Sequence, residues 1–464
     1  MRNGGTFLKI TSPQNKNRIR RKPLNTNMLI ALVFFGLIVL GTALLTLPVS
    51  SRDGKSCGVL TALFTATSST CVTGLILRDT WTQWSGFGQC VIITLIEIGG
   101  LGFMSVASFV IFGLKRRVSM NQQMVIAQSI GADDMADAIR VQKRMLIGCV
   151  GTELAGALLL AIRFTGDYGF PKALKLGLFH SISAFCNAGF DIFGFETPGE
   201  SMIPFNRDPA VMLTLSALIV IGGIGFLVWD EIFRIRSPKK WSVYTKLVLI
   251  TSGGLLLAGT MLICLTEWGN PETMGDMTVP EKILAAFFQS VTSRTAGFDG
   301  LGQGAMTEGG KSVTMFLMLI GGSSGSTAGG LKTVTFVVIL LFLASRMKGS
   351  GTVCAFGRTI PSTQVLNALT VFGVMTVLSF FGGTVICATS PVSFTDGLYE
   401  AVSAIATVGL TTGITPSLSL AGKLLMIVYM YFGRVGILTI SLGFLREKPA
   451  AQKIKFADTN LLIG

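Results

Sequence analysis

Four stretches of this sequence repeat one pattern: FTATSSTCVTGL at 64–75, FHSISAFCNAGF at 179–190, FFQSVTSRTAGF at 287–298 and YEAVSAIATVGL at 399–410. Each begins with an aromatic residue, continues through Ser, Thr and other small residues, and ends in a glycine followed by Leu or Phe. The third copy matches the second better with a one-residue gap, which aligns 290–292 with 181–183. Copies spaced by roughly 110 residues indicate a duplicated supersecondary unit, so we expect four structural repeats.

The composition is typical of an integral membrane protein. Of all residues, 50% are hydrophobic and 13% are charged, whereas an ordinary soluble domain has roughly 25% charged residues. Several apolar runs reach the ~20 residues that cross a bilayer core as a helix. The first run starts near Met28, behind a polar and basic leader that does not resemble a cleavable signal peptide. We therefore expect an all-α protein that crosses the lipid bilayer of the plasma membrane several times.

Positive charge is concentrated in a few parts of the chain, whose formal net charge is +14. Most of the 38 lysines and arginines lie in five segments: residues 1–27, 114–144, 234–246, 346–358 and 446–464. Basic segments next to spanning helices stay in the cytoplasm, so these segments and both termini are predicted to be cytoplasmic. A nucleic-acid partner is excluded, because the sequence has no soluble basic surface with interleaved aromatic residues.

The same order of elements surrounds each copy of the repeat: a spanning helix, a half-helix too short to cross, a glycine loop and a second spanning helix. The expected spanning helices lie at 28–48, 87–114, 145–162, 209–233, 246–266, 312–345, 365–388 and 422–445. The expected half-helices lie at 57–70, 172–185, 280–293 and 395–405. This plan gives eight crossings and divides the chain into a tail, four units and a second tail: 1–27, 28–139, 140–240, 241–348, 349–446 and 447–464.

An irregular glycine loop at membrane depth needs a place where its backbone is satisfied. Such a loop is tolerated only inside protein or against water. Four loops can meet these conditions together on a central pseudo-fourfold axis, where their carbonyl oxygens replace the hydration shell of an ion. Half-helices whose carboxyl ends face the axis add partial negative charge that favours a cation. The pattern therefore predicts a cation pore folded from one polypeptide.

The motif Thr407-Val408-Gly409-Leu410 looks like the TVGYG filter of potassium channels, with Leu in place of Tyr. Together with the three other loops it closely resembles the Trk/Ktr/HKT superfamily of potassium transporters over residues 28–446. The length and the eight-helix plan look most like the Ktr-type membrane subunit. The resemblance implies potassium uptake, a homodimer with one pore per subunit, a cytosolic nucleotide-binding ring as regulator, and no cofactor in this chain.

The resemblance also assigns the residues that bind K⁺. The filter carbonyls would come from Val72, Thr73, Gly74, Asn187, Ala188, Gly189, Thr295, Ala296, Gly297, Thr407, Val408 and Gly409. In this family, glycine at all four filter positions goes with a preference for potassium. The other interpretation of these glycines, as sites of helix packing, explains one or two copies but not four. Among functions, a sodium- or proton-coupled cation carrier, or a relative that does not distinguish Na⁺ from K⁺, is the alternative.

Three carboxylates stand just past the filters, on the side predicted to be external: Asp79, Asp191 and Asp299. A ring of carboxylates there would concentrate cations in an external vestibule. Solvated loop charges are the alternative interpretation, because acidic residues are common in loops.

The second spanning helix of each unit carries a glycine motif, at 98–102, 221–225, 320–323 and 432–436. In the first, second and fourth units these are interpreted as packing glycines. In the third, five glycines among ten residues exclude a continuous helix, and the segment resembles the intramembrane gating loop of the family. The gating residues would be Gly321, Gly322, Ser323, Ser324, Gly325, Ser326, Thr327, Ala328, Gly329, Gly330 and Lys332.

Arg434 stands inside an apolar helix, where the other units have glycine. A charge in the middle of a membrane costs about 2.5–3.5 kcal/mol or more, so it should face a cavity or a partner. We expect Arg434 at the internal end of the pore, near the gating loop, where its charge slows cations. An ion pair with Glu97 or Glu153 is the alternative, and the same two glutamates would be the relays of a proton-coupled carrier.

Other classes of function lack the residues they need. The sequence has no HExxH motif and no phosphate loop of the GxxxxGK[ST] type, which argues against a zinc protease or an ATPase. Its eight cysteines form no CxxC pair and are expected to be buried small hydrophobes, not disulfides or metal ligands. The single histidine, His180, cannot form a histidine metal cluster alone and is interpreted as a half-helix residue.

Overall fold

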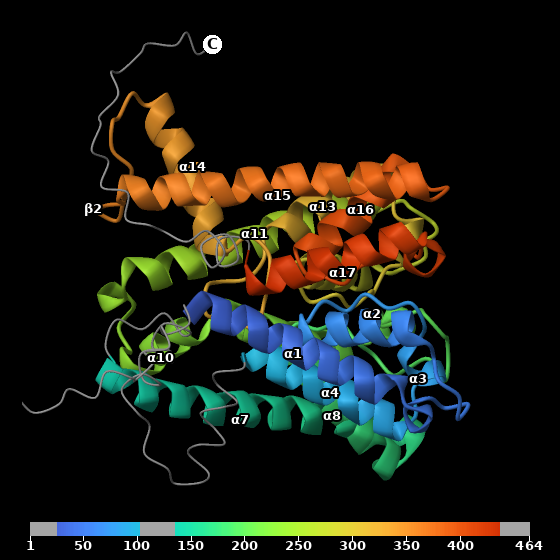
Figure 1. Cartoon of the computed structure of the whole chain (residues 1–464). Coiled ribbons are helices and arrows are strands. Elements are labelled where there is room, and N and C mark those ends of the chain that lie inside the picture. Colours follow the sequence, from blue (N-terminus) through green and yellow to red (C-terminus); the bar gives the residue numbers. More distant parts are fainter. Residues whose placement is uncertain (1–25, 103–134, 437–464) are drawn as a thin grey trace, which may run out of the picture.

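The computed structural model describes residues 26–102 and 135–436, and helices make up most of this part of the chain (Figure 1). Most of the predicted first tail, the second tail, and the ends of the predicted helices 87–114 and 422–445 lie outside the described residues. The two short strands, β1 (Cys354–Ala355) and β2 (Arg358–Thr359), form one small hairpin. The predicted all-α membrane architecture is confirmed for the described residues.

Each of the four units has an outer helix, a short pore helix and an inner helix in the same order. The outer helices are α1 (Thr26–Thr46), α7 (Met135–Tyr168), α11 (Val243–Glu267) and α15 (Ser362–Thr389). The pore helices, predicted as half-helices, are α2 (Val59–Thr70), α8 (Phe170–Phe185), α12 (Val279–Thr292) and α16 (Phe394–Ile405). The inner helices are α4 (Gly86–Leu101), α9 (Pro209–Ile224), α13 (Glu308–Leu319) and α17 (Leu420–Val435).

Among the described residues, three further α-helices lie between these elements: α3 (Thr80–Gln83), α10 (Phe226–Arg234) and α14 (Thr333–Met347). In Figure 1 the outer helices α1, α7 and α15 run in roughly the same direction across the view, with α15 and α7 at opposite edges of the bundle, while α14 leaves it at a steep angle. Each outer helix packs on the pore helix of its own unit, and each pore helix on an inner helix. The pore helices are thus enclosed by longer helices, which supply the protein environment that an irregular loop at membrane depth needs.

The predicted number of eight crossings is not tested by the described residues. Among them, four helices are long and apolar enough to cross a membrane: Met28–Thr46 of α1, Lys143–Tyr168 of α7, α11 and α15. A fifth crossing is counted if α9 and α10 form one span. These two helices meet at 93°, so the helix predicted at 209–233 is not continuous.

The inner helices of the first, second and fourth units end at the last glycine of their motif, which corrects the prediction that this glycine lies within a helix. Gly102, Gly225 and Gly436 follow the ends of α4, α9 and α17 with φ of +81°, +101° and +91°. A glycine at positive φ is a common helix terminator, because other residues rarely adopt that conformation. The sequence motif therefore stops the inner helix as well as packing it.

An earlier glycine of the same motif allows the pore helix to approach the inner helix closely. A methyl group on Gly99, Gly222 or Gly433 would overlap the carbonyl oxygen of the last residue of a pore helix, at Thr70, Phe185 and Ile405 respectively. In three of the four units, this contact between a glycine and a carbonyl oxygen holds the end of the pore helix against an inner helix. This contact fixes the depth at which the glycine loop begins.

Candidate ion pathway

The four glycine loops share an unusual backbone conformation. The first residue of each loop has positive φ although it is not glycine, and the loop glycine two residues later also has positive φ. The first residues are Val72 (φ 56°), Asn187 (58°), Thr295 (71°) and Thr407 (52°). Positive φ is rare for β-branched residues and costs about 1–3 kcal/mol. Its occurrence at one position in four units indicates that the surrounding structure imposes it.

The loop glycines face one another in a closed ring. A methyl group on Gly74 would lie 2.6 Å from the carbonyl oxygen of Ala188, and one on Gly189 would lie 2.7 Å from that of Ala296. In the same way, a methyl group on Gly297 would overlap the carbonyl oxygen of Val408, and one on Gly409 that of Thr73. Each glycine therefore abuts the next unit in chain order, and the fourth abuts the first. No larger side chain fits in this ring.

A hydroxyl group near the end of each pore helix supports the loop. The amide nitrogens of Thr73, Ala188, Ala296 and Val408 donate to the carbonyl oxygens of Ser68, Ser183, Thr292 and Ser403. The same four residues also use their hydroxyl groups, but in two ways. Ser68 and Ser403 accept hydrogen bonds from the amides of Gly74 and Gly409 at 3.1 Å. Ser183 and Thr292 instead donate to the carbonyl oxygens of Phe190 and Phe298.

These hydrogen bonds also settle the alignment of the third repeat. Ala188 bonds to the residue five positions before it, whereas Ala296 bonds to Thr292, four positions before it. The third copy is thus one residue shorter between hydroxyl and loop, in agreement with the gap predicted from the sequence. The Leu or Phe after each loop glycine is at most 1% exposed in all four units, so it anchors the loop in the protein core.

The three predicted vestibule carboxylates line one cavity of about 550 Å³, together with the four loop glycines. Each carboxylate also has a local role. Asp79 accepts from the amide of Thr82 at the start of α3, and Asp191 from that of Phe193. Asp299 accepts from three successive backbone amides and from the side chain of Gln303. The structure brings the three together, and it shows that each also shapes its own loop.

The predicted gating loop packs against the glycine loops. It joins α13 to α14. Its two ends lie next to each other, because the amide of Gly321 donates to the carbonyl oxygen of Leu331 at 2.9 Å. A methyl group on Gly329 would overlap the hydroxyl of Thr407, the first residue of the fourth loop. Thr327 Oγ1 donates to Phe185 O at the end of the second pore helix. The segment therefore contacts the second and fourth units at the level of their glycine loops.

Arg434 holds this segment in place. Its guanidinium donates to the carbonyl oxygens of Thr327 in the gating loop and of Gly99 and Gly100 at the end of α4. All of its recorded hydrogen-bond partners among the described residues are backbone carbonyl oxygens. The alternative of an ion pair with Glu97 or Glu153 is therefore wrong in this structure.

Two further basic side chains contact the same segment. Lys332 Nζ donates to Ala328 O at 2.7 Å. Arg294 donates to Gly321 O and to the hydroxyls of Thr333 and Ser252. Arg294 was not singled out in the sequence analysis, although a charge placed between a pore helix and a glycine loop is a signal that could have found it.

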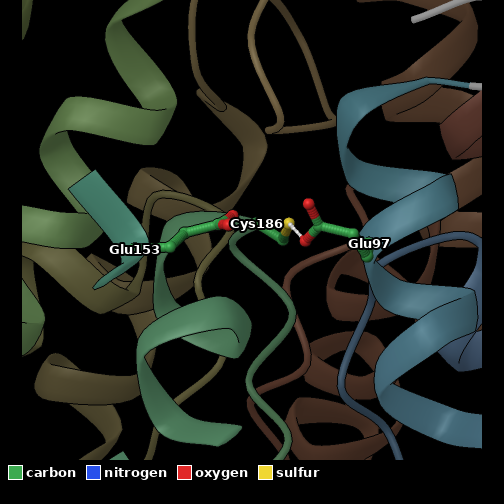
Figure 2. Close-up of side chains that lie close together, drawn as sticks. All are labelled: Glu97, Glu153 and Cys186. Atoms are coloured by element: carbon green, nitrogen blue, oxygen red, sulfur yellow. Dashed lines mark hydrogen bonds between the residues drawn. The ribbon is translucent and has the colours of Figure 1, made fainter. Parts of the chain in front are cut away.

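The histidine, the cysteines and the two helix glutamates named from the sequence lie outside the glycine loops and the predicted gating loop. His180 is buried on α8; its Nε2 accepts from the amide of Ile192, and its Nδ1 lies 2.7 Å from Leu176 O. All eight cysteines are free, but only Cys71, Cys149 and Cys186 are buried. The prediction that the cysteines are buried small hydrophobes is therefore wrong for the other five, of which Cys90 and Cys354 are exposed at the surface of the described protein. Glu97 and Glu153 lie together with Cys186, on α4, α7 and the residue after α8 (Figure 2).

Comparison with known proteins identifies the family. A family model for TrkH, described as "Cation transport protein", matches residues 7–455. The chain belongs to the TrkH family of cation transport proteins. The resemblance found in the four glycine loops is thereby confirmed, and the chain is a member of a transporter family rather than an enzyme.

Individual relatives match over nearly the whole chain. The potassium/sodium uptake protein NtpJ of Enterococcus hirae is 39% identical, over 97% of this chain and 99% of that protein. The Ktr system potassium uptake protein B of Bacillus subtilis is 37% identical, over 94% of this chain and 96% of that protein. The crystal structure of the potassium transporter TrkH from Vibrio parahaemolyticus has the same fold, with a TM-score of 0.70 at 19% identity, over 91% of this chain and 86% of that one.

Proposed function

We propose that this TrkH-family chain takes up potassium across the plasma membrane through a pore lined by its four glycine loops. The observation that carries the proposal is the closed ring, in which each loop glycine abuts a carbonyl of the next unit. Backbone carbonyls held in a ring can replace the hydration shell of K⁺. The twelve filter residues predicted from the sequence make up these loops, and relatives over nearly the full length are named potassium uptake proteins.

The direction and control of transport form part of the same proposal. The cavity that contains Asp79, Asp191 and Asp299 is the external vestibule, and the gating loop closes the internal side of the filter. The basic segments and both termini are cytoplasmic, as the distribution of Lys and Arg indicates. Arg434 on the inner helix α17 and Arg294 after α12 both hold the loop, so movement of α17 would release the Arg434 contact.

We also propose that the chain works as a homodimer with a cytosolic nucleotide-binding ring. Two relatives from Bacillus subtilis are named as proteins B and D of a Ktr system, which supports a membrane subunit with partners. The sequence has no phosphate-loop motif of the GxxxxGK[ST] type. Nucleotide control would thus come from another polypeptide.

The test of this function is flux of K⁺, Rb⁺ and Na⁺ into liposomes that hold only the purified chain. The flux of K⁺ and of Rb⁺ should be well above the flux of Na⁺. Equal sodium and potassium flux would instead favour the unselective alternative, for which the name of the Enterococcus hirae relative, a potassium/sodium uptake protein, is the specific observation. Flux that requires a proton gradient would favour the carrier alternative based on Glu97 and Glu153.

Replacing Ser68 by alanine should weaken selectivity. The change removes the hydroxyl that accepts from the amide of Gly74 and leaves this buried amide without a partner. The cost is about 1–3 kcal/mol, so the K⁺/Na⁺ flux ratio should fall about fivefold or more. The adjacent Ser69 is equally buried, but it donates within its own helix to Thr65 O. Ser69→Ala should therefore keep the ratio, and an equal effect of both changes would contradict the assignment.

Deleting residues 323–327 should raise flux without changing selectivity. The deletion removes the part of the gating loop that contacts Gly223, Phe185 and Arg434, while the four glycine loops stay intact. The measurement is rubidium flux at equal protein content, with the Rb⁺/Na⁺ ratio as internal control. Unchanged flux would show that this segment does not gate the pore, and a changed ratio would place it in the filter instead.

A further inference from the structure

Three side chains from different parts of the chain converge next to the start of the second glycine loop. Glu97 comes from α4, Glu153 from α7, and Cys186 is the residue that follows α8. One oxygen of each glutamate and the sulfur of Cys186 all lie within 4.8 Å of one another. Cys186 Sγ is 3.5 Å from Glu97 Oε2, and Figure 2 shows the three side chains pointing toward a common point. No other such group of His, Cys, Asp or Glu is found among the described residues.

Glu153 lacks the hydrogen-bond donors that a buried carboxylate needs. It is 5% exposed, and its Oε1 has no partner among the described residues. Two other buried glutamates of this chain are satisfied: Glu267 accepts from Thr307, Asn270 and Thr273, and Glu400 accepts from two threonines. An unpaired carboxylate in a protein interior is expensive. Its orientation toward a thiol and a second carboxylate points to a missing positive ligand.

The donor set selects the kind of ligand. Mg²⁺ and Ca²⁺ prefer oxygen donors alone, whereas a thiolate with carboxylates suits Zn²⁺ and similar soft or borderline cations. Zinc binds sulfur at about 2.3 Å and carboxylate oxygen at about 2.0–2.2 Å. Donor atoms at such distances are about 3–4 Å apart, so small side-chain movements would complete the site. Three protein ligands leave the fourth tetrahedral position open to water.

We infer that Glu97, Glu153 and Cys186 form a binding site for a divalent transition cation of the Zn²⁺ class, which inhibits transport. On binding, the Cys186 thiol loses its proton to solvent and its sulfur coordinates the metal, as do one oxygen of each glutamate. The bound metal links the inner helix of the first unit to the outer helix and glycine loop of the second.

The position of the site connects it to both filter and gate. Cys186 directly precedes Asn187, the first residue of the second glycine loop. A methyl group on Gly100 would lie 2.6 Å from Cys186 Sγ, so the end of α4 packs on this sulfur. Gly100 O in turn accepts from Arg434, which holds the gating loop. A metal at the site would bind α4, α7 and the start of the second glycine loop to one another. It would thereby prevent the movement that opens the pore.

Cadmium is the probe, because its bond to a thiolate absorbs in the ultraviolet. The full purified chain is titrated with Cd²⁺, and one high-affinity site per chain is expected. Cys186→Ser should abolish the absorption of this site, and Glu153→Gln should weaken its affinity by more than about tenfold. Cys71 is the matched control: it is buried at the corresponding position after α2 but is not part of the three-residue group. Cys71→Ser should bind as the unaltered chain does.

The transport arm, which rests on the proposed function, uses rubidium flux before and after Cd²⁺ for each variant. The metal should lower flux of the unaltered chain and of Cys71→Ser, but not of Cys186→Ser. The site would be overturned if the Cd²⁺–thiolate absorption persisted in Cys186→Ser. It would also be overturned if Glu153→Gln left the affinity for Cd²⁺ unchanged. Binding as expected with flux untouched by metal would overturn the inhibitory role alone. If Cys186→Ser does not fold, Glu97→Gln serves as the second ligand variant in both arms.

Discussion

Gly409→Ser is expected to abolish selective potassium flux. Gly409 has φ of +99°, and any side chain there overlaps the carbonyl oxygen of Thr73 in the next loop of the ring. The conformation alone costs about 1–3 kcal/mol for a residue other than glycine. Because the neighbour is backbone, the loop must shift, and the carbonyls then leave the positions that replace ion hydration. Potassium flux should fall more than about tenfold, since every 1.4 kcal/mol is tenfold, and the K⁺/Na⁺ ratio should approach unity.

The control for this change separates conformation from crowding. Gly58 precedes the first pore helix with φ of +84°, but nothing lies within 4 Å of a methyl group placed there. Gly58→Ser carries a similar backbone cost without a collision in the ring, so it should lower stability and keep selectivity. Liposome flux of K⁺, Rb⁺ and Na⁺ for both variants decides the matter. If Gly409→Ser still preferred potassium, the four loops would not be the filter.

Arg434→Ala is expected to raise potassium flux. The guanidinium donates to the gating loop at Thr327 and to the end of α4 at Gly99 and Gly100, so its removal frees the loop and deletes a positive charge beneath the filter. At an effective dielectric constant of about 20, two like unit charges repel by about 4 kcal/mol at a separation of about 4 Å and by proportionally less when they are further apart. Flux should therefore rise between about tenfold and a hundredfold.

Two measurements keep this prediction distinct from a loss of folding. Arg434→Lys retains the charge but cannot donate to several carbonyls in a fixed fork, so its flux should lie between those of the unaltered chain and Arg434→Ala. Thermal unfolding and gel filtration of each purified variant report whether the protein still assembles. Reduced flux of a well-folded Arg434→Ala protein would show that the arginine holds the pore open instead of closed.

The pore helices and glycine loops could be predicted closely from the sequence. The half-helix expected at 57–70 is α2 at Val59–Thr70, and that expected at 280–293 is α12 at Val279–Thr292. Local chemistry was sufficient here, because small hydroxyl residues followed by glycine mark both the helix end and the loop. Even the one-residue gap in the third copy was visible, since the hydroxyl residue that supports the loop shifts with it.

The ends of the inner helices and the distant contacts could not be predicted. A glycine such as Gly225 fits equally well inside a tightly packed helix or at its end, and its positive φ is decided by the loop that packs on it. Arg434 was expected near the gating loop and does contact it, but the sequence left an ion pair with Glu97 or Glu153 open as the alternative. The convergence of these glutamates on Cys186 joins three segments far apart in sequence, and a single sequence carries no signal for it.

The closed ring of loops has a genetic consequence. Its four glycines, at positions 74, 189, 297 and 409, belong to one polypeptide, and each is encoded separately. A substitution therefore alters one quadrant of the ring, whereas in a pore built from four identical chains it would alter all four together. The two kinds of hydroxyl support, one in the first and fourth units and the other in the second and third, already differ between quadrants. If the four loops are the proposed filter, ion preference in such a chain can change in single steps, one quarter of the coordination shell at a time.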